Sequence, residues 1–481
     1  MRPGADELSG PRRDAASFRD PAGFVFHQDG RVRRAVTEYG IEAARAVRAT
    51  GLITRLIAAG SLLPEEEIAT SLQGEPDVRL VLEHPRIPFV SYPYEWPFRA
   101  LQAAALLHLD IQIEALDAGV MLTDASAYNV QFIGSRPVFI DHLAFRPHRE
   151  GELWAAHRQF CEQFLHPLLL QHLLGIEFHP WYRGRLEGIP GEEIARLLRW
   201  RHKWSWNVFT NVVLPARLQR LAGRPAVEGR ISRAKMPRGG LRQMLSSLRR
   251  WIAGMEPQGL DATTWAAYDA AVPETESRAI GAFVEEFVRR RAPALVWDLG
   301  CNAGRYCEVA LGAGAGYAVG IDSDPGALDR AFARARDRQL SLLPLLMDIV
   351  NPSPSQGWRG QERESLVARG RPDALLAIAV IHHIAIARNV PLDEIVGLLT
   401  TLAPEGVIGF VPHTDSQARA LFKGREDIFR AYTLENFLSL LQARARIVRQ
   451  QPVAGGLRAP VAGGPQASGQ GGRVLIEFST R

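Results

Sequence analysis

The second half of the chain alternates short apolar runs with segments of helical periodicity. Each apolar run is rich in Val, Ile, Leu and Ala and ends near Gly, Asp or Pro, which is typical of a buried strand. Between these runs, apolar residues recur at helical spacing, which indicates helices that pack on a sheet. Strands are expected at 294–300, 317–324, 342–349, 373–383 and 406–412, and helices at 301–314, 325–336 and 391–403.

Two further apolar runs, Ala445–Val453 and Arg473–Thr480, close the chain and are joined by a segment rich in Gly and Pro. Because no helix separates them, we expect these two strands to pair antiparallel. Strands that alternate with helices predict a parallel sheet covered on both faces. Residues 263–481 are therefore expected to form a Rossmann-like, doubly wound α/β domain with seven strands.

The first half combines one hairpin pattern with mostly helical patterns. Residues 23–36 alternate apolar side chains on both sides of an Asp-Gly pair, which favours a tight hairpin turn. Val81–Pro97 is interrupted by prolines and is predicted to be extended, whereas Phe98–Gly119 has helical periodicity and ends on glycine. With residues 152–221 predicted to be mainly helical, we expect a mostly helical α+β domain here.

Composition shifts set the expected domain boundaries. A basic segment rich in Gly and Pro, residues 221–240, favours a linker. The basic helix predicted at Leu241–Gly254 is either a packed connector or a segment bound to a membrane or partner surface. The connector is favoured, because one short basic helix rarely anchors a protein alone. The expected parts are a disordered tail at 1–16, an N-terminal domain at 17–221, a linker and connector helix at 222–262, and the α/β domain at 263–481.

The overall composition excludes several classes of protein. With 46% hydrophobic and 23% charged residues among 481, the chain is typical of a globular protein. No apolar run is long enough to span a membrane, and the beginning lacks the apolar core of a signal peptide. A net charge of +5 without a basic stripe interleaved with aromatic residues predicts no nucleic-acid partner. The three cysteines form neither a disulfide framework nor a CxxC pair, which favours the cytoplasm.

The stretch VWDLGCNAGRY, residues 296–306, has the pattern of a nucleotide-binding turn. A strand ends near Asp298, small or turn-forming residues follow at Gly300, Asn302 and Gly304, and a helix begins after them. Glycines let the backbone turn sharply and approach a ligand, and Asn tolerates positive φ better than most residues. Ligands of such sheets bind outside the carboxyl ends of the strands.

Acidic residues follow the next two predicted strands. Asp322 ends the second strand, where an acidic side chain suits hydrogen bonds to the hydroxyls of a ribose. The third strand ends in Met347-Asp348-Ile349, which suits an adenine amine held among apolar side chains. Binding of a dinucleotide is disfavoured because the GxGxxG spacing is absent, although Arg305 beside the turn would suit a phosphate.

With the stretches VWDLGCNAG, GIDSD, MDI and LLAIAVIHH, the chain resembles the class I S-adenosylmethionine-dependent methyltransferases over about residues 265–481. Asn302 departs from the family pattern, in which the middle position of the turn is usually Gly. The resemblance implies S-adenosyl-L-methionine as the cofactor. It implies that Asp298 and the turn hold the methionine end, Asp322 the ribose, and Asp348 with its neighbour Ile349 the adenine.

Methyl transfer requires mainly that nucleophile, methyl carbon and sulfur lie in line, and an oxygen nucleophile can also need a base. His382 and His383 end the fourth predicted strand, where that base would lie. Adjacent residues of a strand point to opposite faces, so at most one is expected to be catalytic. The alternative is that both histidines only pack and form hydrogen bonds.

Two loops near the carboxyl ends of the strands are candidates for contact with ligands. The loop at 351–366 carries Trp358, Glu362, Arg363 and Glu364. These residues either cap the adenine pocket or touch substrate, or they belong to a surface loop before a helix. The segment His413–Phe429 follows the fifth strand and is expected to form a substrate lid.

In the first half, Asp124 and Asn129 are followed by an apolar run that ends at Asp141. This order resembles the catalytic loop and metal-binding Asp of protein-kinase-like phosphotransferases. The three residues are candidate ligands of a magnesium nucleotide, but residues 1–202 contain no Lys to clamp phosphates, and Arg is not a simple replacement. Three alternatives stay open: a degenerate kinase-like domain, an unrelated helical accessory domain, and an active phosphotransferase.

Over its whole length the chain also resembles a bacterial methyltransferase group that includes rhizobial nodulation-type proteins, through SFRDPAGFVF, DASAYNVQF and GWRGQERESL. The resemblance implies a small-molecule or glycan substrate, expected to be methylated at oxygen. Gly409 departs from the group, in which an acidic residue is expected. The alternatives are a scaffold protein that binds the cofactor without catalysis, and a bifunctional enzyme with phosphotransfer in the first half.

Overall fold

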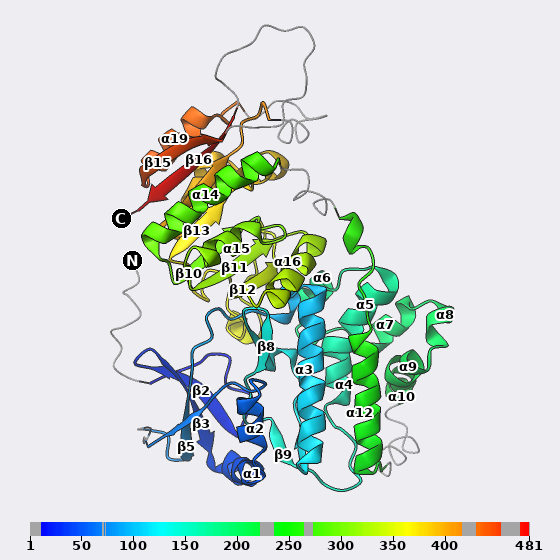
Figure 1. Cartoon of the computed structure of the whole chain (residues 1–481). Coiled ribbons are helices and arrows are strands. Elements are labelled where there is room, and N and C mark those ends of the chain that lie inside the picture. The colour runs from blue at the N-terminus through cyan, green and yellow to red at the C-terminus, as the bar shows by residue number, and fades with distance from the viewer. Residues whose placement is uncertain are drawn as a thin grey trace. The chain divides into compact units, whose positions relative to one another are not determined.

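The computed structural model describes residues 11–69, 72, 74–221, 235–263, 273–415, 430–453 and 472–480 (Figure 1). The chain forms two compact units. The N-terminal unit comprises Met1–Gly259 and Ser355–Glu364, and the C-terminal unit comprises Leu260–Pro354 and Ser365–Arg481. The segment Ser355–Glu364 therefore belongs to the first unit although it lies in the second half of the sequence.

The C-terminal unit contains the seven-stranded sheet that the alternating pattern predicts. Its strand order is β12-β11-β10-β13-β14-β16-β15. Strands β10 to β14 pair parallel, and β16 pairs antiparallel with both β14 and β15, as expected. The bounds are β10 Leu295–Leu299, β11 Tyr317–Asp322, β12 Leu342–Leu346, β13 Ala374–Ala377, β14 Glu405–Phe410, β15 Arg446–Val453 and β16 Arg473–Ser479.

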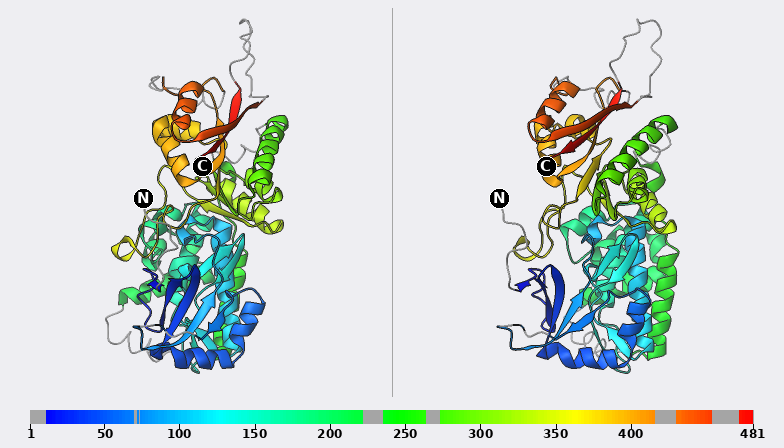
Figure 2. Two further views of the ribbon diagram at one scale, coloured as in Figure 1. Left: turned by 90° about the vertical axis from the view of Figure 1, so that its left-hand side faces the viewer. Right: turned by 60° about the vertical axis from the view of Figure 1, so that its left-hand side comes forward.

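Helices cover both faces of this sheet. Figure 2 shows α14 and α15 on one face and α17 with α19 on the opposite face. Apolar side chains of α14 pack with Val296, Leu376 and Val407 from three neighbouring strands, all fully buried. The helices of this unit have the bounds η5 Leu260–Ala262, α14 Glu274–Arg291, α15 Arg305–Gly312, α16 Pro325–Asp337, η7 His383–Ala387, α17 Leu392–Leu402 and α19 Leu434–Gln442. The short helix η6, Trp358–Gly360, lies in the segment that belongs to the N-terminal unit.

The fourth strand is shorter than predicted. It ends at Ala377, and the chain then turns into a short helix that includes His382 and continues through η7, a π-helical turn. The prediction that both histidines lie on this strand is therefore wrong. The apolar run continues through Ile381 because the helix is also buried, and a short apolar run does not distinguish a strand from a buried helix.

The N-terminal unit begins with a five-stranded antiparallel sheet in the order β1-β2-β3-β5-β4. The predicted hairpin forms β2 and β3, and Asp29 and Gly30 turn with φ values of 51° and 72°. The short strand β1 pairs with β2, so the part of the expected disordered tail that the structure describes is ordered. The bounds are β1 Arg12–Arg13, β2 Gly23–Gln28, β3 Arg31–Thr37, α1 Glu38–Ala49, α2 Leu52–Ala58, β4 Glu66–Ile68 and β5 Val78–His84.

A mostly helical part follows, built around α3, Phe98–Asp117, which ends before Gly119 at a φ of 73°. Two small antiparallel pairs, β6 with β9 and β7 with β8, follow α3. The bounds are η1 Pro93–Glu95, β6 Val120–Leu122, η2 Ala127–Asn129, β7 Val130–Ile133, β8 Arg136–Phe139, β9 Phe145–Pro147, α4 His157–Phe160, η3 Cys161–Leu165, α5 His166–Leu174, α6 His179–Gly184, α7 Gly191–Leu197, α8 Trp200–Lys203, α9 Trp206–Val208, η4 Phe209–Val213 and α10 Leu214–Leu221.

The basic helix predicted at Leu241–Gly254 is α12, Arg238–Ala253, and it packs on α3 (Figure 1). Its apolar residues Leu241, Leu245, Leu248 and Ile252 are buried. Burying a Leu or Ile side chain contributes about 1.5–3 kcal/mol, so this face stabilises the unit instead of being available to a membrane. The packed connector is thus the alternative that the structure favours, and none of the described helices is both long and apolar enough to cross a bilayer.

Two segments that the sequence singled out lie outside the described residues for most of their length. They are the linker, of which residues 222–234 are not described, and the expected lid, of which residues 416–429 are not described. At the end of the linker, α12 begins at Arg238, three residues before the helix that the sequence predicts.

Candidate functional site

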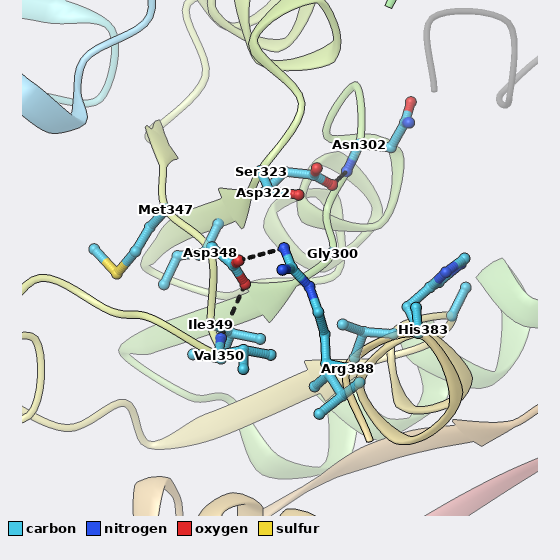
Figure 3. Close-up of a pocket in the computed structure, with 15 residues that line it drawn as sticks. Gly300, Asn302, Asp322, Ser323, Met347, Asp348, Ile349, Val350, His383 and Arg388 are labelled. Atoms are coloured by element: carbon cyan, nitrogen blue, oxygen red, sulfur yellow. Dashed lines mark hydrogen bonds and ion pairs between the residues drawn. The ribbon is translucent and has the colours of Figure 1, made fainter. Parts of the chain in front are cut away.

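A pocket of about 270 Å³ opens at the carboxyl edge of β10, β11 and β12 (Figure 3). Parallel pairing of β10 with β11 aligns Leu299 with Ile321, so the turn after one strand lies beside the acidic end of the next. The lining residues are Gly300, Asn302, Ile321, Asp322, Ser323, Met347, Asp348, Ile349, Val350, Ala379, Val380, His383, Ile384, Ala387 and Arg388. Five of the seven cofactor residues proposed from the sequence are therefore together: Gly300, Asn302, Asp322, Asp348 and Ile349.

The glycine turn is held in a conformation that few residues adopt. Gly300, Asn302 and Gly304 have φ values of 75°, 47° and 77°, so the expectation that Asn replaces Gly without loss of the turn is confirmed. A Cβ atom at Gly300 would lie 3.2 Å from Cβ of Val380 across the pocket. Gly304 precedes α15 and does not line the pocket, because its Cα faces Leu342 and Ala331 behind the turn.

Asp322 joins the turn to the second strand through its carboxylate. The backbone N–H of Asn302 donates to one oxygen at 2.8 Å, and that of Asp324 donates to the other at 2.9 Å. Burial raises the pKa of Asp322, while these two backbone donors act in the opposite direction. The carboxylate is therefore fixed in position on the wall of the pocket.

Arg388, which the sequence did not single out, lies opposite the glycine turn. Its Nη2 is 2.7 Å from Oδ2 of Asp348, and the backbone N–H of Val350 donates to Oδ1 of Asp348 at 3.0 Å (Figure 3). The Asp348 carboxylate, predicted to hold an adenine amine, thus already has a cationic partner. Forty positions separate the two residues, so no local pattern indicated this pair.

Asp298 lies beneath the turn and does not line the pocket. It is 1% exposed, and the Cys307 thiol donates to its Oδ2 at 3.3 Å. Burial without a cationic partner among its described contacts raises the pKa of Asp298 to about 7. The structure therefore places Asp298 where it supports the turn from behind.

The two histidines differ in position. His383 lines the pocket, whereas His382 is fully buried behind it, with the ring centroids 4.0 Å apart. Burial, together with the charge of Arg473, lowers the pKa of His383 to about 4, so its imidazole is neutral at neutral pH. Arg473 belongs to a buried ionic group that the sequence did not indicate, with Glu276 at 2.9 Å and Asp415 at 3.2 Å.

A second polar cluster lies in the N-terminal unit and brings together Asp124, Asn129 and Asp141. The Asn129 amide nitrogen is 3.1 Å from Oδ2 of Asp124 and 3.5 Å from Oδ2 of Asp141. Arg34 of β3 pairs with Asp141 at 2.9 Å. Burial and the Asp141 charge raise the pKa of Asp124. These three residues, which the sequence connected only through their spacing, therefore lie close together in space.

The loop predicted to cap the adenine pocket contacts other residues. Glu362 pairs with Arg19 at 2.6 Å, the Arg363 guanidinium lies 3.9 Å from the Tyr128 ring centroid, and the backbone N–H of Glu364 donates to the Tyr92 hydroxyl. Neither these residues nor Trp358 are among the residues that line the pocket, and the contacts described for the loop lie within the N-terminal unit. Among the described residues, no group of three or more His, Cys, Asp or Glu side chains is arranged to hold a metal ion.

The chain is similar to characterised and solved proteins, although no family model matches it. It is 44% identical over 455 residues to nodulation protein NoeA of Rhizobium meliloti (strain 1021), covering 93% of this chain and 95% of the relative.

Among solved structures, the N-methyltransferase NodS of Bradyrhizobium japonicum WM9 matches 43% of this chain and 97% of its own, at 15% identity and a TM-score of 0.30. Magnesium protoporphyrin IX methyltransferase (ChlM) of Synechocystis PCC 6803, with bound SAH, matches 43% of this chain and 84% of its own, at 16% identity and a TM-score of 0.29. Similarities at this level do not assign a function by themselves.

Proposed function

The chain belongs to the family of nodulation protein NoeA, and we propose that it is an S-adenosyl-L-methionine-dependent methyltransferase. The observation that supports the proposal is the pocket at the carboxyl edge of the sheet. It combines a turn of positive φ at Gly300 and Asn302 with carboxylates that follow the next two strands, Asp322 and Asp348. This is the arrangement that the resemblance to class I methyltransferases implies.

The residues of the pocket fit the cofactor in chemistry. The turn at Gly300 leaves the space that a side chain would fill, and Asp322 presents a fixed carboxylate for ribose hydroxyls. Asp348 and the apolar side chain of Ile349 suit an adenine, provided that Arg388 moves or shares the Asp348 carboxylate. The cofactor itself would supply an activated methyl group, so the chain needs only to position an acceptor.

We propose that the acceptor is a hydroxyl group of a small molecule or saccharide. His383 lines the pocket and is neutral at neutral pH, so its imidazole can accept a proton as the acceptor oxygen is methylated. With a pKa of about 4 it is a weak base, which means that proton removal must accompany formation of the bond to carbon. His382 is buried away from the pocket and serves packing in this proposal.

Calorimetric titration of S-adenosyl-L-methionine into the wild-type chain tests the cofactor. We expect micromolar affinity, typical of a well-formed small-molecule site, and a sharp loss in Asp322→Ala. Asp337→Ala is the matched control, because Asp337 is an exposed carboxylate at the end of α16. A folded wild type that binds no cofactor would contradict the proposal.

Catalysis is distinguished from a scaffold role by transfer of a labelled methyl group to candidate saccharides. His383→Gln is expected to reduce turnover about a hundredfold, the lower range for general-base catalysis. Cofactor binding measured in parallel should persist. Binding without transfer to any tested acceptor would favour the scaffold alternative.

A second candidate function, phosphotransfer or nucleotide binding, is favoured by the convergence of Asp124, Asn129 and Asp141. Their order along the chain, after the long helix α3 and beside strands β7 and β8, agrees with the kinase-like resemblance. Arg34 on β3 provides a cation next to Asp141 in a region that lacks Lys. Two carboxylates and an amide are a donor set that suits Mg²⁺ with a nucleotide.

Thermal unfolding with ATP and magnesium tests this second function. Stabilisation of the wild type that is lost in Asp141→Ala, and kept in the exposed control Asp77→Ala, would support nucleotide binding. Absence of any shift would favour a degenerate domain, and the methyltransferase proposal would be unaffected.

A further inference from the structure

Three tryptophans on the N-terminal unit are almost fully exposed. Trp200, Trp204 and Trp206 are 77%, 81% and 76% exposed, although Trp is usually among the more buried residues. All three fall in the seven-residue segment from Trp200 to Trp206, which comprises α8 and the start of α9. In Figure 1 this segment lies at the outer edge of the helical part of the unit. Trp200 and Trp204 are four positions apart in a helical turn, so their side chains project from the same side.

Cations alternate with these rings in the sequence WRHKWSW. No described residue forms an ion pair with Arg199, Arg201 or Lys203 in this structure. From Ile194 to Leu221 the sequence contains six Arg or Lys residues and no Asp or Glu. Two of the six, Arg196 and Arg220, pair with Glu192, so the uncompensated positive charge is concentrated beside the tryptophans. Burial, together with the neighbouring charges of Arg201 and Arg199, lowers the pKa of His202.

We propose that Trp200, Trp204 and Trp206, with Arg199, Arg201 and Lys203, form a surface that docks on an anionic lipid bilayer. Tryptophan favours the boundary between hydrocarbon and water, where the ring is buried and the indole N–H stays hydrated. Lys and Arg beside it are attracted by anionic headgroups. Binding would hold the chain at the surface without inserting a spanning helix.

The arrangement differs from that of α12, the other basic amphipathic helix. There the apolar side chains Leu241, Leu245 and Leu248 are buried on α3, and Arg242 pairs with Asp117. Around α8 and α9 the three aromatic rings, Arg199 and Arg201 remain exposed, and Lys203 is half-buried. Charge complementarity therefore favours an anionic surface over an uncharged partner such as a neutral glycan, which would use the rings but not the cations.

Flotation of the full chain with lipid vesicles tests the proposal. We expect binding to vesicles that contain phosphatidylglycerol, and none to vesicles of phosphatidylcholine alone. The variant W200A/W204A/W206A should bind about tenfold or more weakly, since it lacks the apolar anchor. Each of Arg199→Gln and Lys203→Gln should weaken binding about fivefold. Trp358→Ala, which removes a 63% exposed Trp elsewhere, is the matched control and should bind as the wild type does.

Quenching of tryptophan fluorescence by brominated phosphatidylglycerol gives a measurement that requires no variant. A folded wild type that neither floats nor is quenched overturns the proposal. So does undiminished binding in the triple variant. Self-association lost in the triple variant would assign the surface to a second copy instead, and retention on an oligosaccharide resin without vesicle binding would assign it to a glycan.

Discussion

At the scale of single residues, the sequence predicts the roles of some residues in and around the pocket and not of others. Gly300 and Gly304 are predictable because positive φ favours glycine, and Asn302 because Asn tolerates positive φ. Asp322 is predictable because it ends an apolar run. The ion pair of Arg388 is not predictable, because its partner Asp348 lies forty positions away and only the fold brings the two together.

Gly409 is required by close packing between neighbouring strands. A Cβ atom there would lie 1.9 Å from the carbonyl oxygen of Ile378, so the acidic residue expected from the resemblance does not fit this backbone. We expect Gly409→Ala to destabilise the chain by about 1–3 kcal/mol, the typical cost of overpacking.

Urea unfolding would measure this loss, with Gly312→Ala as the control. A Cβ at Gly312 meets nothing within 4 Å, so that substitution should be neutral or slightly stabilising. Equal stability of the two variants would show that the strands can separate at Gly409 without cost.

Asp298 gives the unfolding free energy a pH dependence of known sign. Its pKa of about 7 in the folded chain exceeds the ordinary value of 3.8, so between these values the native state holds a proton that the unfolded state releases. The contribution of Asp298 to the free energy of unfolding is therefore greatest at acidic pH. It falls as the pH rises towards 7, by at most about 1.4 kcal/mol per pH unit.

Asp298→Asn should remove that part of the dependence. Urea unfolding of both proteins between about pH 5 and about pH 8 would measure it, the wild type losing more stability than the variant as pH rises. Parallel curves for the two proteins would show that Asp298 is ionised in the native state throughout.

At the scale of elements, periodicity identified the strands of the C-terminal sheet and the helices α15, α16 and α17 with small errors at their ends, whereas α14 and α19 were not predicted. The fourth strand is the exception, since His382 and His383 lie in a buried helix that continues the same apolar run. The basic helix at Leu241–Gly254 had two interpretations because its apolar face is the same whether it meets protein or lipid. Only packing on α3 distinguishes them.

Removal of a buried side chain from α12 checks that packing. Leu245 is fully buried, and Leu245→Ala is expected to cost about 2–5 kcal/mol of unfolding free energy. Gln243→Ala on the exposed face of the same helix should change little. Chemical denaturation compares the two, and similar values for both would show that the helix does not pack on α3 in solution.

At the scale of the whole molecule, the division into units does not follow the order of the sequence. Ser355–Glu364 belongs to the N-terminal unit, where Arg363 lies over Tyr128 and Glu362 pairs with Arg19. Contacts between residues more than two hundred positions apart have no signature in composition or periodicity. The sequence therefore left two alternatives for this loop, contact with the pocket or substrate and a place on the surface, and did not indicate its contacts with the N-terminal unit.

This placement predicts different protease sensitivity in the full chain and in a fragment of residues 260–481. In the full chain Arg363 is half-buried, whereas the fragment lacks Tyr128, Tyr92 and Arg19. Trypsin should cut after Arg363 faster in the fragment, as mass spectrometry of timed digests would show. Cleavage after the exposed Arg359 is the internal reference, and equal ratios of the two cuts would contradict the placement.

The sequence by itself determined the parallel sheet, the glycine turn and the acidic ends of the second and third strands, because periodicity and backbone conformation are local properties. The order and spacing of Asp124, Asn129 and Asp141 also indicated that these three residues could form one site. Tertiary structure decided which histidine reaches the pocket and that Arg388 pairs with Asp348. It also decided that the apolar face of α12 is buried while Trp200, Trp204 and Trp206 are exposed. These features depend on which surfaces meet, and side chains distant in sequence settle that.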